Sequence, residues 1–233
     1  MRSSNMRVAV SQRLGCEACE PHMCACGKPL DARGLHGLSY RGSAPRQQRH
    51  SHLNDIIWRA IKRAQIPAVK EPVSLMRDDS KRPDGTTRLP WARGKPMAWD
   101  VTVPDAYAES HNGSTAAKPG GAASKTAQNK IDKYAKLAST HIFYPLRWRQ
   151  VAHGTTWHDM AIELTQEICR RISAITEDTG ETTFLFQRLS IALQRGNAVS
   201  VVGCNWMSAA AVAVVATSGE RPRRKGRHGV ICR

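Results

Sequence analysis

The sequence contains few acidic residues and no long apolar run. Asp and Glu number 19 against 35 Lys and Arg in 233 residues, which gives a formal net charge of +16. The longest apolar stretch, Met207 to Ala216, is shorter than the about 20 residues that cross a bilayer as a helix. Residues 1–10 lack the continuous apolar core of a signal peptide. The sequence therefore predicts an intracellular protein that does not span a membrane.

The basic balance indicates the class of partner. A strongly positive chain is expected to bind polyanions, nucleic acid first and an acidic membrane surface second. The alternative is a soluble protein whose charge has no such partner. Hydrophobic residues make up 41% of the chain, so a packed core is possible. The length fits one α/β domain, or one domain with a small module.

The seven cysteines do not predict a disulfide framework, because disulfides are rare in the reducing interior of a cell. Four of them lie within the first 26 residues and two histidines follow. The candidate ligands are Cys16, Cys19, Cys24, Cys26, His36 and His50. Four sulfur or nitrogen ligands complete a tetrahedral structural zinc site. Spacing alone leaves open which four bind, and a loose leader with free thiols is the alternative.

Apolar periodicity predicts the remaining elements. We expect a helix over 51–66, strands within 67–104, a mobile loop over 110–124, a helix over 125–139, a strand over 142–146, and helices over 157–176 and 182–197. The expected organisation is a Cys/His-rich segment over 1–50, an α/β domain over 51–203, and a basic, disordered tail over 204–233.

Two carboxylates mark the candidate active site. Asp84 follows a proline at the mouth of a predicted hairpin, and Asp100 lies inside the short apolar strand Met97 to Val103. A lone carboxylate is costly to bury there without a partner. If the two acids face each other across the hairpin, their β-carbons lie ~5 Å apart, which suits one bridging Mg²⁺. The alternative for Asp84 is a simple turn residue before Gly85.

Other charged residues surround this pair in the sequence. Glu71 lies in the preceding predicted strand and is either a third acid at the metal or a solvent-facing side chain. Lys130 and Lys133 share one face of a predicted helix. The cations that flank the hairpin and are expected to grip a nucleic-acid backbone are Lys81, Arg82, Arg93 and Lys95.

Several motifs occur in a specific order. They are Cys24-Ala-Cys26-Gly27, Gly34-Leu-His36, Arg49-His50, Leu53-Asn54-Asp55, Arg82-Pro-Asp-Gly85, Trp99-Asp-Val-Thr-Val103, Lys130-Ile-Asp-Lys-Tyr134, Phe184 to Ser190 and Gln194 to Asn197. Together they resemble the restriction-like endonuclease domain that closes the polyprotein of non-LTR retrotransposons. That domain belongs to the PD-(D/E)XK superfamily. The resemblance covers about residues 7–203 and implies a mixed sheet flanked by helices, preceded by a zinc-knuckle-like segment.

The resemblance implies roles for particular residues. Asp84 and Asp100 correspond to the two acids and, with the Val101 carbonyl, would hold Mg²⁺. The lysine of the motif falls at Thr102, so Lys130 or Lys133 would replace it.

The resemblance also implies zinc ligands. They are Cys24 or Cys26, His36 and His50, with Cys16 or Cys19 as a further ligand. The family has a cysteine where this chain has Tyr40, and tyrosine is not an ordinary structural zinc ligand.

The expected function is Mg²⁺-dependent nicking of double-stranded DNA in the nucleus, with element RNA as a further partner and neither a membrane nor a small-molecule substrate. The chain has no reverse-transcriptase motif, so it resembles a detached terminal fragment. The first alternative is a catalytically inactive DNA-binding remnant of that domain. The second is a zinc-dependent protein-interaction module.

Overall fold

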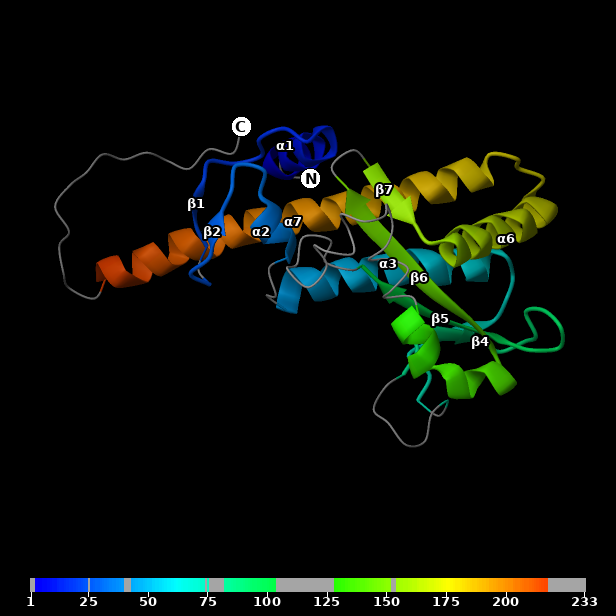
Figure 1. Ribbon diagram of the computed structural model, residues 1–233. Helices are drawn as coiled ribbons and strands as arrows, with labels where there is room; N and C mark the ends of the chain where they lie inside the picture. The colour runs from blue at the N-terminus through cyan, green and yellow to red at the C-terminus, as the bar shows by residue number, and fades with distance from the viewer. Residues whose placement is uncertain are drawn as a thin grey trace.

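A five-stranded mixed sheet organises the chain in the computed structural model (Figure 1). The structure describes residues 3–24, 26–39, 43–73, 75, 82–103, 128–151 and 154–217. The strands are β3 (Ala68–Lys70), β4 (Gly85–Thr87), β5 (Met97–Thr102), β6 (Ile142–Val151) and β7 (Gly154–Trp157), and they lie in this order in the sheet. All neighbours are antiparallel except β5 and β6, which are parallel. A parallel pair needs a crossover connection, and the chain between these two strands is helical at residues 128–133 and in η2 (Ala135–Ser139).

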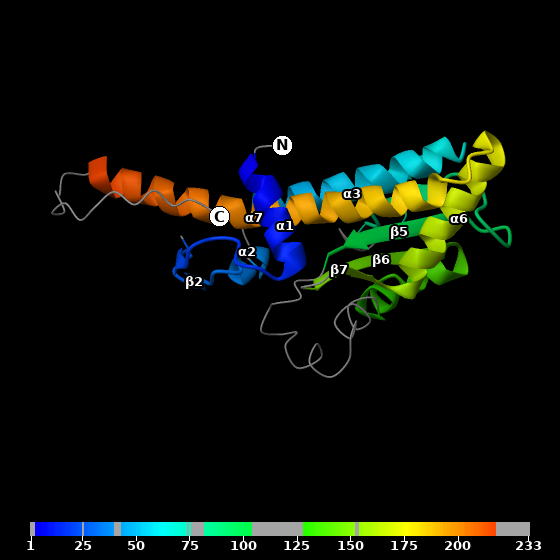
Figure 2. The same ribbon diagram turned by 90° about the horizontal axis from the view of Figure 1, so that it is seen from above.

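Helices cover both faces of the sheet. The other elements are α1 (Ser3–Leu14), β1 (His22–Met23), β2 (Pro29–Leu30), α2 (Leu35–Ser39), α3 (Ser43–Arg63), α6 (Asp159–Thr176) and α7 (Glu181–Thr217). α3 and α7 run side by side along the molecule, and the strands lie beside them (Figure 2). The predicted mixed sheet flanked by helices is therefore confirmed.

Strand β5 is buried on both faces, and its alternation separates two cores. Met97, Trp99 and Val101 face the main core, which α3, α6 and α7 complete. Ala98 faces the other side and packs against Tyr134 and Leu137. Because side chains alternate along a strand, Asp100 lies on the same side as Ala98. The acid therefore points toward the crossover segment and away from the large apolar core.

The approach of Trp99 to Gly85 fixes the position of Asp84. Gly85 is the antiparallel partner of Trp99, and a β-carbon on Gly85 would lie 2.0 Å from the indole ring. The indole Nε1 donates to Asn54 Oδ1 at 2.8 Å, and Asn54 Nδ2 donates to the Asp84 carbonyl at 3.2 Å. Helix α3 thus holds the backbone at Asp84 through one asparagine.

Several elements differ from the predicted ranges. Helix α3 begins at Ser43 rather than residue 51, and Pro45 is accommodated in its first turn, where the missing N–H costs nothing. Strand β3 ends at Lys70 because Glu71 has a left-handed backbone with φ 48°. Helix α7 continues to Thr217, since the Ala-rich run after residue 208 has high helix propensity. The predicted loop 110–124 lies outside the described residues.

The N-terminal segment packs against α7. A β-carbon on Gly37 would lie 2.8 Å from Val201 Cα, and one on Gly34 would lie 2.9 Å from the Val201 side chain. Val8 and Leu38 share a small buried cluster with Val201. The boundaries predicted at residues 50 and 203 both fall inside helices, α3 and α7.

Replacing Gly85 with alanine should destabilise the protein by about 1–3 kcal/mol, because the new methyl group collides with the Trp99 ring. Urea denaturation followed by circular dichroism measures this change. The matched control is Gly203→Ala, where the nearest atom is Pro45 Cγ at 3.7 Å. Equal stability of Gly85→Ala and wild type would contradict the observed packing.

Candidate active site

The two predicted acids lie at the start of β4 and near the end of the neighbouring strand β5. Asp84 immediately precedes β4, and its Oδ2 accepts hydrogen bonds from the Val101 backbone N–H and from His50 Nε2, the latter at 3.0 Å. The Val101 bond joins Asp84 directly to the strand that carries Asp100. Asp84 and Asp100 line the same cleft, and His50, which the sequence predicts as a zinc ligand, lies beside Asp84.

Asp100 is almost completely buried and is surrounded by donors. Its side chain is 4% exposed, and Lys130 Nζ lies 2.9 Å from each carboxylate oxygen. Thr102 Oγ1 donates to Oδ1 at 3.0 Å, and the Tyr134 hydroxyl lies 3.1 Å from Oδ2. The same hydroxyl also lies 2.8 Å from the Arg82 carbonyl. A buried carboxylate is tolerated only with such compensation.

A buried cation, Arg147, lies on the neighbouring strand β6. Arg147 is fully buried on β6, where it is the register partner of Thr102. Burial lowers the pKa of Arg147 to about 10, and the negative charges of Asp100 and Asp84 oppose this shift. Burial, followed by the charge of Asp100, raises the pKa of the Tyr134 hydroxyl. The hydroxyl is therefore a neutral hydrogen-bonding group at physiological pH.

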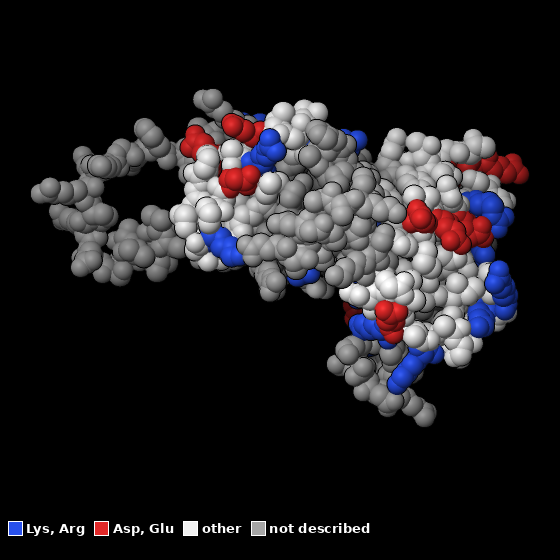
Figure 3. Space-filling view, in the orientation of Figure 1, with Lys and Arg blue, Asp and Glu red and all other residues white. Residues whose placement is uncertain are grey.

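The acids open into a cleft with a volume of about 750 Å³. Five cations line it: Arg46, Arg49, Arg82, Lys130 and Lys133. Asp84 and Asp100 are the carboxylates among its described lining residues. On the face shown in Figure 3, by contrast, the described Lys and Arg side chains are interspersed with Asp and Glu. The cleft, which five cations and two carboxylates line, is therefore more clearly basic than that face.

The predicted nucleic-acid-binding residues are divided by the fold. Arg82 lines the cleft. Arg93 and Lys95 lie in the β4–β5 loop, at the opposite end of β5 from Asp100, and Lys95 Nζ donates to the Ala138 carbonyl at 3.0 Å. Lys81 lies outside the described residues. The hairpin loop therefore does not contribute to the cleft, and the first half of α3 supplies Arg46 and Arg49 in its place.

Glu71 does not join the acids. Its side chain is exposed, and only its backbone N–H contacts the site, by donating to the Asp84 carbonyl at 3.1 Å. Of the two alternatives for this residue, the structure shows the solvent-facing one. The left-handed backbone at Glu71 turns the chain out of β3.

The two candidate lysines have different contacts. Lys130 bonds both oxygens of Asp100. Lys133 Nζ instead donates to the Tyr134 hydroxyl at 3.0 Å and lies 4.6 Å from the centre of that ring. Both line the cleft, and Lys130 is the lysine bonded to Asp100.

A separate group of metal-ligating side chains lies in the N-terminal segment. The ligand atoms of Cys24, Cys26 and His36 all lie within 4.8 Å of one another. Cys26 Sγ is 3.1 Å from His36 Nε2. The turn between β1 and β2 presents both cysteines, and Gly27 adopts φ 80° there. Burial, followed by the charge of Lys28, lowers the pKa of His36, which favours the neutral imidazole that binds metals.

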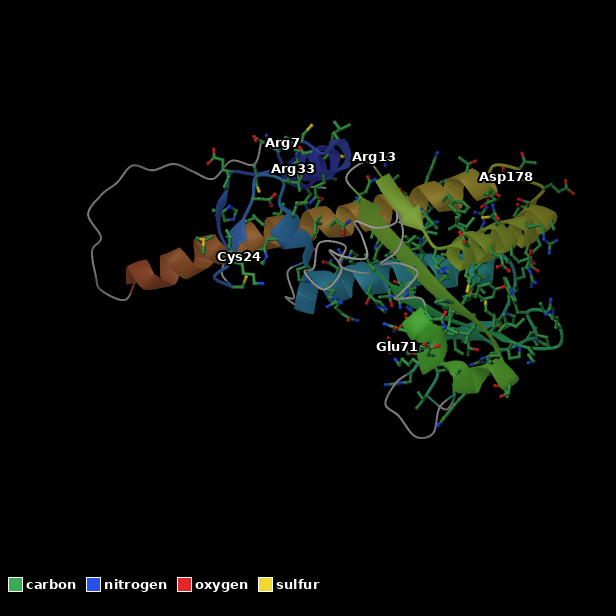
Figure 4. The ribbon with its side chains drawn as sticks, viewed as in Figure 1. Arg7, Arg13, Cys24, Arg33, Glu71 and Asp178 are labelled. Carbon is green, nitrogen blue, oxygen red and sulfur yellow. The ribbon has the colours of Figure 1, made fainter. Side chains whose placement is uncertain are left out.

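Three other predicted zinc ligands lie elsewhere. His50 is the partner of Asp84, so its assignment to the zinc site needs correction. Cys19 Sγ donates to the Asp31 carbonyl at 3.5 Å, and Cys16 is exposed, near the Leu14 carbonyl. Tyr40 lies outside the described residues. Figure 4 shows Cys24 in the N-terminal segment, away from Glu71, whose backbone N–H contacts Asp84. The Cys/His group and the acid site are therefore separate.

Several residues of the acid site are not among the residues predicted for it, and three of these, His50, Asn54 and Arg147, do carry a signal in the sequence. His50 and Asn54 are four residues apart on α3 and therefore share one face. The predicted helix begins at residue 51 and excludes His50, so the prediction does not pair the two residues. Arg147 stands alone between Leu146 and Trp148 in an apolar strand, the same type of signal that identified Asp100.

Comparison of the chain with protein-family models, with curated proteins and with solved structures gives no match. Within the described residues, no helix is both long enough and apolar enough to cross a membrane.

The contact between His50 and Asp84 predicts a pH dependence of stability. The hydrogen bond to Asp84 is the main cause that raises the pKa of His50, and burial partly opposes it. This ion pair stabilises the folded protein fully below the ordinary histidine pKa of about 6.5. Its contribution is lost as the pH rises through the higher pKa of the folded state.

We therefore expect His50→Gln to flatten the change in free energy of unfolding between about pH 6 and pH 8. Urea denaturation across this range measures the change. His52→Gln, an exposed histidine on the same helix, is the control and should retain the wild-type slope. A wild-type slope in His50→Gln would show that the His50–Asp84 pair does not form.

Proposed function

We propose that this protein is a Mg²⁺-dependent endonuclease domain that hydrolyses a DNA phosphodiester. The observation that carries the proposal is the pair Asp84, just before β4, and Asp100, on the adjacent strand β5, at the wall of a cleft with five lining cations. Two acids suit a divalent cation, and the cations suit a polyanion. The order of the sequence motifs supports the same function through their resemblance to restriction-like PD-(D/E)XK nucleases of non-LTR retrotransposons.

The residues present fit Mg²⁺. This ion prefers oxygen ligands and is commonly held by one or two carboxylates with several waters. Asp84 and Asp100 supply the carboxylates, the Val101 backbone lies between them, and the cleft has room for water and a phosphate. When bound, Mg²⁺ would lower the pKa of a water and neutralise charge on the phosphate.

The protein side chains then have separate tasks. His50 and the Val101 N–H orient Asp84, while Thr102 and Tyr134 orient Asp100. Arg46 and Arg82 line the cleft, where they can bind the phosphates of the DNA strand. Arg49 also lines it, but this side chain is buried and bonds Asn197. Lys130 is positioned to stabilise negative charge on the reacting phosphate, because its ammonium is already at Asp100.

Nicking of supercoiled plasmid in Mg²⁺ tests the function. We expect the wild-type protein to nick and both Asp84→Asn and Asp100→Asn to lose about 10²-fold or more in rate, as when a preorganised electrostatic group is removed from an active site. Glu71→Gln is the matched control and should keep the wild-type rate, because that acid faces solvent. Equal nicking by wild type and both aspartate variants would exclude this active site.

An inactive DNA-binding remnant is the second candidate. Two observations favour it. Thr102 occupies the place of the motif lysine, and the oxygens of Asp100 are already bonded to protein donors. A remnant would bind DNA with an affinity that falls with salt, with a log–log slope of about −0.9 for each phosphate contacted, and would leave the plasmid intact.

We also propose that Cys24, Cys26 and His36 hold a structural Zn²⁺. Thiolate and neutral imidazole are the ligands that zinc prefers, and the three ligand atoms already converge. Because β1 and β2 have two residues each, the metal would stabilise the short turn that joins them.

Metal analysis of the purified protein tests this site. We expect one zinc per chain in wild type and loss of that zinc in Cys26→Ser, since one of three identified ligands is removed. Cys16→Ser is the control, because Cys16 lies outside the three-residue group. Loss of zinc in Cys16→Ser, or its retention in Cys26→Ser, would contradict the proposed ligand set.

A further inference from the structure

We propose that Lys130 holds the place of the divalent cation on Asp100, and that cation binding transfers the ammonium from Asp100 to the substrate phosphate. The inference rests on the proposed function and assigns Lys130 a role in it that the neighbouring Lys133 does not have. It concerns the exchange of one cation for another at a buried carboxylate.

Asp100 accepts hydrogen bonds at both carboxylate oxygens. A carboxylate offers about four lone-pair positions. Lys130 Nζ lies 2.9 Å from both oxygens, Thr102 Oγ1 donates to one of them at 3.0 Å, and the Tyr134 hydroxyl lies 3.1 Å from the other. Protein groups thus surround both oxygens. A metal ion that binds Asp100 must displace one of these groups.

The three groups around Asp100 differ in how easily they can move. Tyr134 is buried in the small core beside Ala98 and Leu137, and its hydroxyl also contacts the Arg82 carbonyl and Lys133. Thr102 belongs to β5, where pairing with β6 fixes its backbone. Lys130 has a flexible four-carbon stem, and its side chain is 25% exposed at the cleft. The ammonium is therefore the donor that can move at the lowest cost.

Asp100 needs a compensating positive charge before and after metal binding. An uncompensated carboxylate with 4% exposure would be strongly destabilised in the interior. Exchange of an ammonium for a divalent cation keeps Asp100 compensated before and after binding. His50 remains on Asp84 Oδ2, and Asp84 Oδ1 is the second oxygen that this acid can offer. The site can therefore be assembled from Asp84 and Asp100 with a single side-chain movement.

The displaced ammonium stays within the cleft. Lys130 lies on the wall of the cleft that also contains Arg82 and Arg49. A phosphate bound between these cations and the metal lies in the same cleft, so the released ammonium stays near it. The ammonium of Lys133 is held differently, because it donates to the Tyr134 hydroxyl at 3.0 Å.

Calcium binding in the absence of DNA tests the exchange. Ca²⁺ takes oxygen ligands and so avoids the cysteine-rich site. We would titrate Ca²⁺ alone into the full chain at pH 8 and follow the heat of binding. Lys130→Met should bind Ca²⁺ about tenfold more tightly than wild type, because no ammonium competes for Asp100. Lys133→Met, which removes the same charge three residues away, should change the affinity by no more than about threefold.

Two further variants keep the outcomes distinct. Lys130→Gln should also bind Ca²⁺ more tightly, which guards against a folding defect in the methionine variant, and Asp100→Asn should abolish the site. If Lys130→Met and Lys133→Met have the same affinity while Asp100→Asn binds no calcium, the exchange is overturned and the metal site of the proposed function stands. If wild type and every variant bind no calcium, both the exchange and the acid-pair metal site are overturned.

Discussion

The burial of Asp100 in the middle of β5 is the constraint on which the rest of the site depends. The strand is covered on both faces, so its one carboxylate must find compensation inside the protein. The crossover segment supplies it, because residues 128–139 bring Lys130 and Tyr134 onto the face that Asp100 shares with Ala98. The same segment makes the parallel pairing of β5 and β6 possible. The connection required by the topology is thus also the source of the charge required by the acid.

Helix α3 joins the acid site to the rest of the molecule. One side of it contributes Leu53, Ile57 and Ile61 to the core. On another side, His50 contacts the side chain of Asp84 and Asn54 contacts its backbone carbonyl. Its Arg49 bonds Asn197, and its Arg63 bonds Glu181, so α3 is tied to α7 at two points. Because α2 packs on α7 as well, the Cys/His segment and the acid site are attached to one pair of helices. A structural metal in that segment would support the frame of the cleft without entering it.

Local patterns predicted the parts of this structure that depend on neighbours in the sequence. The alternation around Trp99 and Asp100 identified β5, and the apolar periodicity of residues 157–176 identified α6 almost to the residue. Long-range pairing could not be read in this way. The placement of Arg147 beside Thr102 depends on the register of two strands 45 residues apart, and the preference for Lys130 over Lys133 depends on how the crossover packs. His50 was assigned to zinc because residue type alone does not distinguish a metal ligand from the partner of a carboxylate.

A crystal structure of the protein grown with Mn²⁺ tests the central claim most directly, because the anomalous scattering of manganese locates the ion independently of activity. We expect an anomalous peak between the carboxylates of Asp84 and Asp100, with Lys130 Nζ moved out of hydrogen-bonding distance of Asp100. An Mn²⁺ ion found at Cys24, Cys26 and His36 alone, with Lys130 still bonded to both oxygens of Asp100, would contradict the claim that the two acids form a divalent-cation site.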